Sequence, residues 1–534
     1  MSNLLLIIRL LLLLSTSAPP SLGLAHQSTS ISAFRHCLQN HNRSDAVLYL
    51  PTNSSFLPVL NAYIHNKRFI GPATAKPLAI VTPTHESHVQ ATVLCAKANN
   101  LQIRTRSGGH DYEGLSYRSP SPFILLDLNN LRRIELDVET ETAWVEAGAT
   151  LGELYYAIAN KTNTLAFPAG VCPSIGVGGH FAGGGYGNLL RKYGLSVDNV
   201  IDARVVNARG EILNRSTMGD LFWAIRGGGG ASFGVILSWK VKLVRVPEVV
   251  TAFQVDRWLD QGASDIFYRP RHCYRWQQVS TNLSKDIFIR AMPQVVTTPE
   301  NKTKVMISFV GEYLGRTKDL VRYLSRSFPE LGFREVDGKE MSWVETVLFW
   351  AMIPVNKPLE VLLNRKSEPS YFKSKSDYVT EIIPREALPG IWDALLKVGP
   401  CFTQWNPYGG RMAEIDTDEA AYAHRAGYLF KVQYYVWWVE DGEEAEARHV
   451  GALDALHEAV TPYVTKEPRE AYLNYRDLEN GVNSVEKPEW SKAKVYGEKY
   501  FKGHFERLAK IKAEFDPENF FRDQQSIPPF PHSH

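Results

Sequence analysis

The chain has 534 residues, of which 44% are hydrophobic and 22% are charged, so its composition is that of a globular protein and not of a disordered or low-complexity chain. Its 59 basic and 57 acidic residues give a formal net charge of +2, and no run of Lys or Arg supplies the positive surface that nucleic-acid binding requires. The length predicts two domains, or one domain with a large insertion.

The N-terminus predicts export. Residues 4–14 are almost all apolar and small residues follow, a pattern typical of a secretory signal peptide, although Arg9 interrupts the run. The run is too short to span a bilayer, and no later stretch is apolar enough to do so. We therefore expect a signal peptide over residues 1–25, no membrane span, and a location in the extracellular space, the cell wall or the vacuole. The alternative is a buried N-terminal helix.

Two kinds of residue fit an exported chain. Sequons of the form Asn-x-Ser/Thr predict N-glycans on surface loops at Asn42, Asn53, Asn160, Asn214, Asn282 and Asn301. The 5 cysteines are Cys37, Cys95, Cys172, Cys273 and Cys401. Because the number is odd and the compartment is oxidising, at least one cysteine lies outside any intramolecular disulfide.

From residue 69 to 246 the pattern indicates short strands and helices separated by glycine. The expected elements, in order, are a strand at residues 79–81, a helix at 85–98, a strand at 123–126, a strand-like alternation at 135–147, and a helix that Thr150 caps and that extends to Ala159.

From residue 247 to 468 glycine becomes rarer and the alternating segments become longer. Alternating strands are expected at 304–313 and 428–438, and amphipathic helices at 319–328 and 389–398, which together predict an antiparallel sheet backed by helices. The final stretch is polar and aromatic, with a single helix expected at 490–515. The whole chain is therefore of the α+β class.

The first segment with chemical content is Ser107-Gly108-Gly109-His110. Two glycines allow the backbone to turn tightly and to approach a ligand closely, and Ser107 with the neighbouring amides has the donors to bind a pyrophosphate. Taken alone, the segment favours an ordinary turn with a surface histidine.

The second segment, residues 168–187, contains Cys172-Pro-Ser-Ile175 and eight glycines in twenty residues. Such a run favours neither a stable helix nor a regular strand, and it suits a backbone wrapped around a flat, polar cofactor. It matches neither the dinucleotide-binding fingerprint nor the P-loop. A third glycine cluster runs from Gly227 to Gly234.

Together these three segments resemble the berberine bridge enzyme-like family, a group of FAD-linked oxidases with the vanillyl-alcohol-oxidase (PCMH-type) fold. The resemblance covers about residues 37–529 and includes the segments that begin at Asn474 and Asp516. It implies a two-part FAD-binding domain at 26–246, a substrate domain of antiparallel sheet backed by helices at 247–470, and a C-terminal segment at 471–530 that returns to the FAD domain.

The resemblance also implies a cofactor site. In such proteins FAD is bonded covalently through its 8α-methyl group to a histidine and through ring carbon C6 to a cysteine, and His110 and Cys172 stand at these positions. The further cofactor contacts that we expect are Arg106, Ser107, Gly108, Gly109, Ile175, Gly176, Gly179, Gly183 and Gly184. Cys37 and Cys95 match the family's N-terminal disulfide, Cys273 and Cys401 would be free or structural thiols, and no metal is expected.

For the chemistry beside the flavin, the resemblance assigns Tyr475 as the base that removes the substrate proton. A tyrosine is a poor base unless its phenolate is stabilised, and Lys431 is the expected cation. Strand alternation puts Lys431 and Gln433 on one face. Tyr112 and Tyr186 match further active-site positions. Without the resemblance, the Lys–Gln pair would be interpreted as a solvated face and the tyrosines as packed aromatics.

These residues favour oxidation of a phenolic or allylic, monolignol-like alcohol, with a small aromatic substrate, oxygen or another electron acceptor, and a monomeric enzyme. Members of the family also catalyse oxidative cyclisation, Diels–Alder-type cyclisation and sugar oxidation, and a secreted pollen-type or defence protein with a vestigial flavin is the non-enzymatic alternative. The aromatic run at 434–438 and Trp405 fit either a pocket for a large substrate or core packing. By resemblance, Ile175 predicts slow use of oxygen.

Overall fold

The structure, a computed structural model, describes residues 21–41, 48–267, 275–366, 368–399 and 401–531, with side chains from Ser30 onward. Most of the expected signal peptide, the sequon at Asn42 and the thiol of Cys273 lie outside these residues. Among the described helices none is both long and apolar enough to cross a membrane. The chain folds as α helices around separate β sheets, which confirms the predicted α+β class.

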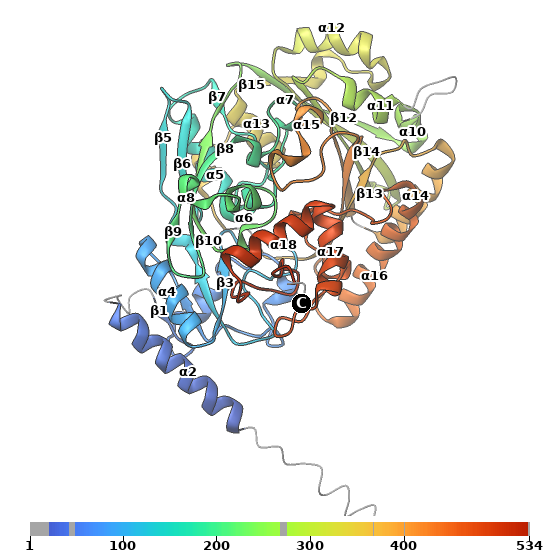
Figure 1. Cartoon of the computed structure of the whole chain (residues 1–534). Coiled ribbons are helices and arrows are strands. Elements are labelled where there is room, and N and C mark those ends of the chain that lie inside the picture. The colour runs from blue at the N-terminus through green and yellow to red at the C-terminus, as the bar shows by residue number, and fades with distance from the viewer. Residues whose placement is uncertain (1–20, 42–47, 268–274, 367, 400, 532–534) are drawn as a thin grey trace, which may run out of the picture.

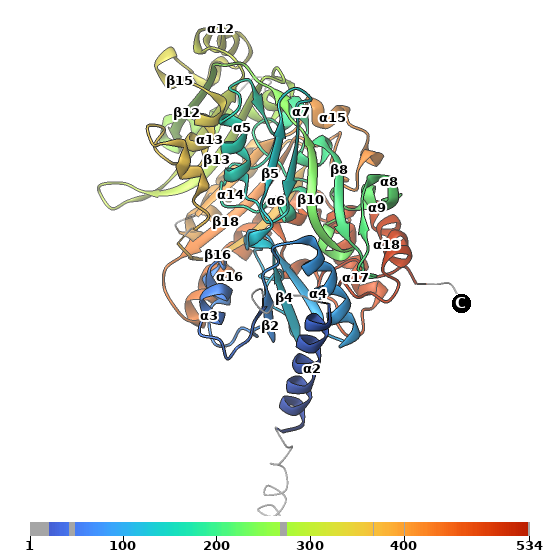
Figure 2. The same cartoon turned by 90° about the vertical axis from the view of Figure 1, so that its left-hand side faces the viewer.

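A small mixed sheet forms the N-terminal corner (Figure 2). Its strand order is β1-β2-β4-β3, with β2 and β3 both parallel to the central β4. The strands are β1 (Leu48–Tyr49), β2 (Ala79–Val81), β3 (Gln102–Arg106) and β4 (Phe123–Asp127). Helix α4 (Glu86–Ala98) connects β2 to β3, and α2 (Ser21–Asn40) packs against α4. The disulfide Cys37–Cys95 that the resemblance implied joins these two helices.

A second, five-stranded antiparallel sheet has the order β5-β6-β10-β8-β9. Its strands are β5 (Ile134–Asp137), β6 (Thr142–Glu146), β8 (Val200–Val206), β9 (Ile212–Leu213) and β10 (Val235–Lys242). The alternation at 135–147 is thus a hairpin and not one strand. The Asp137 carboxylate accepts hydrogen bonds from the amides of Glu139 and Thr140, and the turn ends at Glu141, whose φ is +52°.

Short elements connect and cover these two sheets. They are α3 (Phe56–Asn61), α5 (Leu151–Ala159), β7 (Leu165–Ala166), α6 (Val177–Ala182), α7 (Leu190–Tyr193), α8 (Arg215–Met218), α9 (Leu221–Ala224) and β11 (Val244–Arg245). Helix α5 begins with the predicted cap at Thr150, which forms a capping box with Glu153. Helix α6 corrects the prediction that the glycine-rich run would not be helical. It lasts only six residues and is held by tertiary packing, not by propensity.

The third sheet is antiparallel throughout and has seven strands in the order β15-β12-β14-β13-β17-β18-β16. The strands are β12 (Val250–Trp258), β13 (Ile287–Thr297), β14 (Thr303–Tyr313), β15 (Gly338–Met341), β16 (Tyr371–Val379), β17 (Cys401–Pro407) and β18 (Phe430–Trp438). The helices of this region are α10 (Ala263–Phe267), α11 (Arg275–Asn282), α12 (Thr317–Ser327), α13 (Trp343–Trp350), α14 (Leu388–Val398), α15 (Arg411–Glu414) and α16 (Glu443–Ala459). The elements expected here agree with the observed bounds to within two residues.

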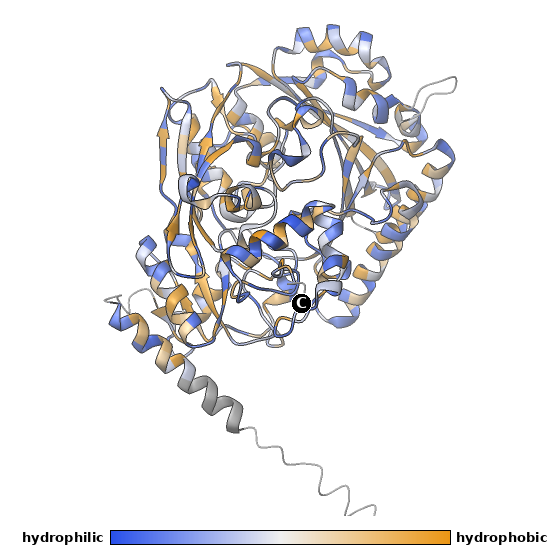
Figure 3. Ribbon diagram, in the orientation of Figure 1, coloured by the Kyte–Doolittle hydropathy of each residue, from blue (hydrophilic) through white to orange (hydrophobic). Residues whose placement is uncertain are grey.

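The seven-stranded sheet has a core face and a face toward the N-terminal half. Phe430, Val432, Tyr434 and Val436 of β18 join a buried cluster with α14 and α16, the helices on the outer side of the sheet (Figure 1). Figure 3 shows many hydrophilic residues on α12 and α16. The alternate residues of β18 point the other way, toward the glycine-rich loops.

The C-terminal segment packs against the N-terminal half. Its residues Tyr496, Phe505 and Leu508 belong to the same buried cluster as the five-stranded sheet. The single helix expected at 490–515 is two helices, α17 (Trp490–Phe501) and α18 (His504–Phe515). The break falls at Lys502, whose φ of +54° ends the first helix, and it lets the Phe505 ring pack against Gly497, where no side chain would fit.

Candidate functional site

Two glycine-rich loops cross behind the candidate cofactor site. Strand β3 leads into Gly108 and Gly109, and the loop after Cys172 leads into Gly176 and α6. A Cβ on Gly176 would lie 2.2 Å from the Gly108 nitrogen, and a Cβ on Gly108 would lie 2.2 Å from the Gly176 nitrogen. Only glycine at both positions allows the two backbones to meet this closely.

The crossing brings His110 and Cys172 to the same hydroxyl group. His110 Nε2 lies 3.0 Å from Ser174 Oγ, and Cys172 Sγ lies 3.5 Å from that same oxygen. The His65 ring stacks on the His110 ring with a centroid separation of 3.9 Å, and His65 Nε2 lies 2.9 Å from the Gly108 carbonyl oxygen. Burial, followed by His65, holds the pKa of His110 well below its usual value, so the imidazole is neutral. Cys172 is a free, half-buried thiol.

Exposed glycine backbone follows Cys172 along the chain. Within α6 the residues Val177, Gly178 and His180 are buried, whereas Gly179 is exposed and a Cβ added to it would meet no atom within 4 Å. An opening onto glycine backbone at a helix N-terminus, beside a neutral imidazole and a thiol, is compatible with a flavin that reaches both side chains. The residues present therefore fit the cofactor that the resemblance implied.

Several residues expected to contact the cofactor have other neighbours. Arg106 is fully buried, pairs with Asp127 at 2.7 Å and donates to the Val59 and Leu60 carbonyls, so it supports the loop from behind. Ser107 donates to the Ala147 carbonyl.

Three further residues expected at the cofactor complete this picture. A Cβ on Gly183 would lie 2.0 Å from Asn474 Oδ1, and one on Gly184 would lie 2.9 Å from the Tyr422 ring, so these glycines admit the C-terminal segment and the tyrosine cluster. Ile175 lies half-buried between Cys172 and α6, with its carbonyl accepting a hydrogen bond from the Leu151 amide.

The expected active-site side chains come together at the facing sheet. Tyr186 OH and Tyr475 OH share a short hydrogen bond. Gln433 Nε2 donates to Tyr112 OH at 2.9 Å, and the Tyr112 and Tyr475 rings meet edge to face at 5.6 Å. Lys431 Nζ lies 3.2 Å from the centroid of the Tyr186 ring. All five residues therefore belong to one cluster.

Lys431 and Gln433 are not a solvated face. Their exposed fractions are 0% and 4%, and both point away from the core side of β18, as strand alternation predicted. Among the described residues no hydrogen-bond acceptor contacts Lys431 Nζ, and its second close neighbour is the Tyr472 ring at 3.6 Å. Burial, and then Arg290, hold the pKa of Lys431 well below its ordinary value.

The structure adds a cation that sequence reasoning missed. Arg290, on β13, is buried, donates to Asn406 Oδ1 at 2.6 Å and lies over the Trp350 ring at 5.1 Å. Burial raises the pKa of Tyr186, while Arg290 and the hydrogen bonds from Tyr475 and Asn406 lower it. For Tyr475, burial and its neighbouring tyrosines all raise the pKa. The pKa of both phenols is therefore raised, but at Tyr186 a cation and two hydrogen bonds oppose the rise. The available signal was one basic residue in the apolar strand at 287–291.

The aromatic run at 434–438 divides between the two faces. Tyr434 and Trp438 pack in the core cluster with Trp405, whereas Tyr435 and Trp437 continue the row of Lys431 and Gln433. Along this row exposure rises from 0% at Lys431 to 37% at Trp437. The core interpretation thus holds for Trp405, Tyr434 and Trp438, and the pocket interpretation stays open for the other two.

Comparison with known proteins agrees with this geometry. Residues 77–216 match the model of an FAD binding domain, and residues 471–528 match the model described as berberine and berberine like. These matches, on this fold, define an FAD-dependent flavoprotein oxidoreductase. The berberine bridge enzyme-like 17 protein of Arabidopsis thaliana is 50% identical over 509 residues, which are 94% of this chain and 95% of that protein. The chain belongs to the berberine bridge enzyme-like family.

Other relatives have more specific names. The monolignol oxidoreductase AtBBE-like 13 of Arabidopsis thaliana is 50% identical, with 89% of this chain and 88% of that protein covered. The solved structure of BBE-like #28 from Arabidopsis thaliana has a TM-score of 0.88 at 43% identity, covering 94% of this chain and 100% of that one. Wild-type Phl p 4.0202, described as a glucose dehydrogenase, has a TM-score of 0.88 at 42% identity, covering 93% and 100%. A variant of Phl p 4 with isoleucine replaced by valine is described as a glucose oxidase.

Proposed function

We propose that this protein oxidises a phenolic or allylic primary alcohol of the monolignol type to its aldehyde, using FAD bonded covalently to His110 and Cys172. The observation that carries the proposal is the hydrogen-bonded pair Tyr186–Tyr475 beside the buried cations Lys431 and Arg290. A pair of phenols next to two cations is an arrangement that can accept the hydroxyl proton of an alcohol.

In this proposal the two crossing loops hold the cofactor. When bound, FAD supplies the acceptor for the hydride that leaves the alcohol carbon. His110 is neutral and its Nε2 is engaged by Ser174, which leaves Nδ1 as the atom for a covalent bond. Acid precipitation tests this assignment: yellow colour stays with the denatured polypeptide in His110→Ala and in Cys172→Ala, and is released only from the double variant. Release from either single variant contradicts the two-bond assignment.

Accepting the proton falls to the tyrosine pair. A tyrosine with an ordinary pKa is a weak base, so the phenolate needs stabilising charge. Tyr186 has that charge from Arg290 and has a donor in the Tyr475 hydroxyl, so we assign the phenolate to Tyr186 and the relay of the substrate proton to Tyr475. Gln433 fixes Tyr112 through its hydroxyl, which leaves Tyr112 to orient the substrate hydroxyl.

Aromatic side chains favour an aromatic substrate. Phe402 stacks on Tyr435 with centroids 4.9 Å apart, and Trp437 lies 5.8 Å from Phe402, on the same face of the sheet as Lys431. Together with a monolignol oxidoreductase among the relatives at 50% identity, this face supports an aryl alcohol over a sugar.

The experiment is anaerobic single-turnover reduction of the flavin by coniferyl alcohol. Bleaching is expected in the wild type. Tyr186→Phe and Tyr475→Phe should each slow it by about 100-fold or more, the usual contribution of a general base. Tyr496→Phe is the matched control, because its buried hydroxyl donates to the Ser526 carbonyl and belongs to a different buried cluster from the tyrosine pair. An unchanged rate in both active-site variants removes the tyrosine pair from the mechanism, and bleaching by glucose but not by the alcohol replaces the substrate.

The proposal extends to the acceptor and the location. By resemblance, Ile175 stands where valine goes with fast use of oxygen, and an isoleucine-to-valine variant of a relative is described as a glucose oxidase, so we assign an acceptor other than oxygen. The disulfide Cys37–Cys95 and the five described sequon asparagines, all exposed, support export and glycosylation. Peptide mass mapping of the native protein tests for glycans at Asn53, Asn160, Asn214, Asn282 and Asn301.

A further inference from the structure

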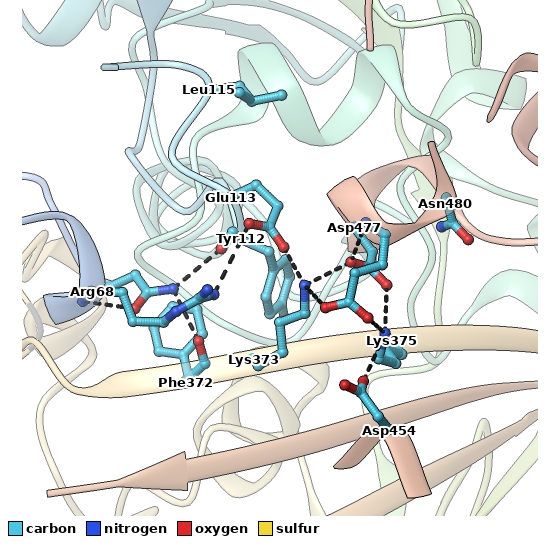
Figure 4. A network of polar contacts seen from close by, with 12 residues as sticks. Arg68, Tyr112, Glu113, Leu115, Phe372, Lys373, Lys375, Asp454, Asp477 and Asn480 are labelled. Atoms are coloured by element: carbon cyan, nitrogen blue, oxygen red, sulfur yellow. Dashed lines mark hydrogen bonds and ion pairs between the residues drawn. The ribbon is translucent and has the colours of Figure 1, made fainter. Parts of the chain in front are cut away.

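A buried charged cluster lies beside the active site, at the edge strand of the seven-stranded sheet (Figure 4). Two lysines of β16, Lys373 and Lys375, are 2% and 4% exposed. They contact carboxylates from three distant parts of the chain: Glu113 in the N-terminal half, Asp454 on α16, and Asp477 and Glu479 in the C-terminal segment. None of these residues was singled out by the sequence.

Lys373 is the member that joins the two halves of the site. Its ammonium donates to Glu113 Oε1 at 2.6 Å and to Asp477 Oδ1 at 2.6 Å, and both carboxylates are buried. Glu113 follows Tyr112 directly in the chain, and Asp477 stands two residues after Tyr475. One side chain thus connects the segment that carries Tyr112 to the segment that carries Tyr475.

A second contact fixes the same junction. The Asn66 amide donates to the Tyr112 carbonyl at 3.2 Å and to the Phe372 carbonyl at 3.1 Å, so the residue before Glu113 and the residue before Lys373 share one donor. The Tyr112 ring also meets the Phe372 ring edge to face at 5.6 Å. The strand therefore determines where Tyr112 lies, and Lys373 determines where the Tyr475 segment lies relative to it.

We propose that Lys373 is a positioning residue for the alcohol oxidation proposed above, and that it sets the edge-to-face contact of Tyr112 with Tyr475 by holding Glu113 and Asp477 on one ammonium group. The proposal rests on that proposed function for its kinetic readout only. A buried ion pair contributes little net stability compared with well-packed apolar residues. Stability alone therefore does not explain why these charges are buried here, whereas a role in positioning does.

Lys375 provides a built-in comparison. It lies two residues further along the same strand, is equally buried, and contacts Asp477 at 3.0 Å and Asp454 at 3.0 Å as well as Glu479. In the described structure it makes no contact with the segment of Tyr112. Removing Lys375 leaves the tie between Glu113 and Asp477 in place, whereas removing Lys373 breaks it.

The pH dependence of the rate is expected to differ between Lys373→Met and Lys375→Met as well. Although burial lowers the pKa of Lys373, the surrounding carboxylates Glu113, Asp477 and Glu479 together raise it above its ordinary value, so the ammonium keeps its charge throughout the working range. Three other charged groups belong to the cluster. Lys375 of β16 interacts with Lys373, and the guanidinium groups of Arg68 and Arg118 each lie 4.0 Å from Glu113. In Lys373→Met, Glu113 and Asp477 face each other without the ammonium, and like charges raise the pKa of one of them.

The test compares Lys373→Met with Lys375→Met in anaerobic single-turnover reduction and in thermal unfolding. Lys373→Met should lower the limiting rate by about 10- to 100-fold, because small misplacements of reacting groups cost this much, and should change substrate affinity little. Lys375→Met should keep a limiting rate within about threefold of the wild type. Both variants should lose similar thermal stability. Relative to the wild type at the same pH, lowering the pH should partly restore the rate of Lys373→Met and leave that of Lys375→Met unchanged.

Two further measurements keep the proposal testable. If Lys373→Met does not fold, Glu113→Gln removes only the tie to the Tyr112 segment, and Glu479→Gln is its control, since Glu479 contacts both lysines but is half exposed. Crystal structures of the variants report the Tyr112–Tyr475 separation without any reaction. Equal rates and unchanged ring separation in Lys373→Met and Lys375→Met overturn the positioning role. Failure of the wild type to oxidise the alcohol overturns the proposed function instead, and the crystal structures then decide the positioning role alone.

Discussion

Two regions meet at the proposed active site, and one is built mainly from backbone whereas the other is built mainly from side chains. The cofactor side consists of backbone: Gly108 and Gly176 cross so closely that each excludes a Cβ at the other. The proposed substrate side is built from side chains, among them Arg290, Asn406 and Lys431 on β13, β17 and β18, whose backbone is ordinary antiparallel sheet. A backbone site tolerates almost no substitution, whereas a sheet face can exchange its side chains without changing its strands.

The relatives carry varied names. Proteins 42–50% identical to this chain, over nearly its whole length, are described as a monolignol oxidoreductase, a tetrahydroberberine oxidase and a glucose dehydrogenase. All are compatible with one cofactor side and different substrate sides. Substitutions on the two sides should therefore fail in different ways, which gives the comparison its tests.

The largest effect is expected on the cofactor side. In Gly176→Ala the new Cβ would lie 2.1 Å from Ser107 Oγ and 2.2 Å from the Gly108 nitrogen, so the loops cannot cross and folded protein should be lost. In Gly179→Ala the Cβ meets no protein atom, so the protein should fold and contain less flavin. Yield, thermal unfolding and flavin absorbance per chain measure both. Normal flavin content in Gly176→Ala would contradict the backbone-built site.

On the substrate side, Lys431→Met should be more stable and slower than the wild type. Burial of an ammonium without a hydrogen-bond acceptor costs free energy, about 1–3 kcal/mol, which methionine avoids. Loss of a cation beside the tyrosine pair should lower the rate of flavin reduction by about 100-fold. Higher thermal stability together with a lower rate is the expected pair of results.

The pH profile sharpens this prediction. Because the pKa of Lys431 lies below its ordinary value in the folded protein, the ammonium is present only below that lowered pKa, and the rate should fall as pH rises through it. The rate of Lys431→Met should lack this descending limb. Its rising limb should move to higher pH, because less positive charge remains to stabilise the phenolate. A profile identical to that of the wild type excludes Lys431 from the ionisation.

The same contrast decides what the sequence could predict. The strands at 79–81 and 304–313 and the Thr150 cap are local patterns, and the structure has them where they were expected. The helix α6 and the break at Lys502 were missed because packing overrides propensity there: α6 is held by the sheet, and the break lets Phe505 reach Gly497.

The site divides in the same way. His110 and Cys172 stand in contiguous glycine-rich segments, so a motif is enough to propose them as a cofactor site. Arg290 and Lys373 acquire their roles from strand pairing and from segments more than 100 residues away, such as those of Asn406 and Asp477. No local pattern records which residue will lie opposite another in a sheet with the order found here.

A smaller effect is expected at the boundary of the two regions. Ile175→Val removes one methyl group next to Cys172 and should raise the rate at which air reoxidises the reduced enzyme, by about 10-fold or more if the methyl blocks access. The rate of reduction by the alcohol should not change, because Ile175 contacts none of the tyrosine cluster in the described structure. Rapid reoxidation of the wild type, unaltered in the variant, would exclude Ile175 as a barrier to oxygen.

The smallest effect separates the two faces of β18. Trp437 is 37% exposed on the row of Lys431, and Trp438 is 3% exposed in the core cluster. If the aromatic row binds the ring of the substrate, Trp437→Ala should weaken binding of coniferyl alcohol by about 2- to 10-fold, the value of one aromatic contact, at unchanged thermal stability. Trp438→Ala should do the reverse, lowering the unfolding temperature and leaving affinity unchanged, because its cavity lies on the far side of the sheet. Equal affinity in the wild type and Trp437→Ala would confine substrate binding to Gln433, in the inner part of the row, and to Tyr112, which is bonded to it.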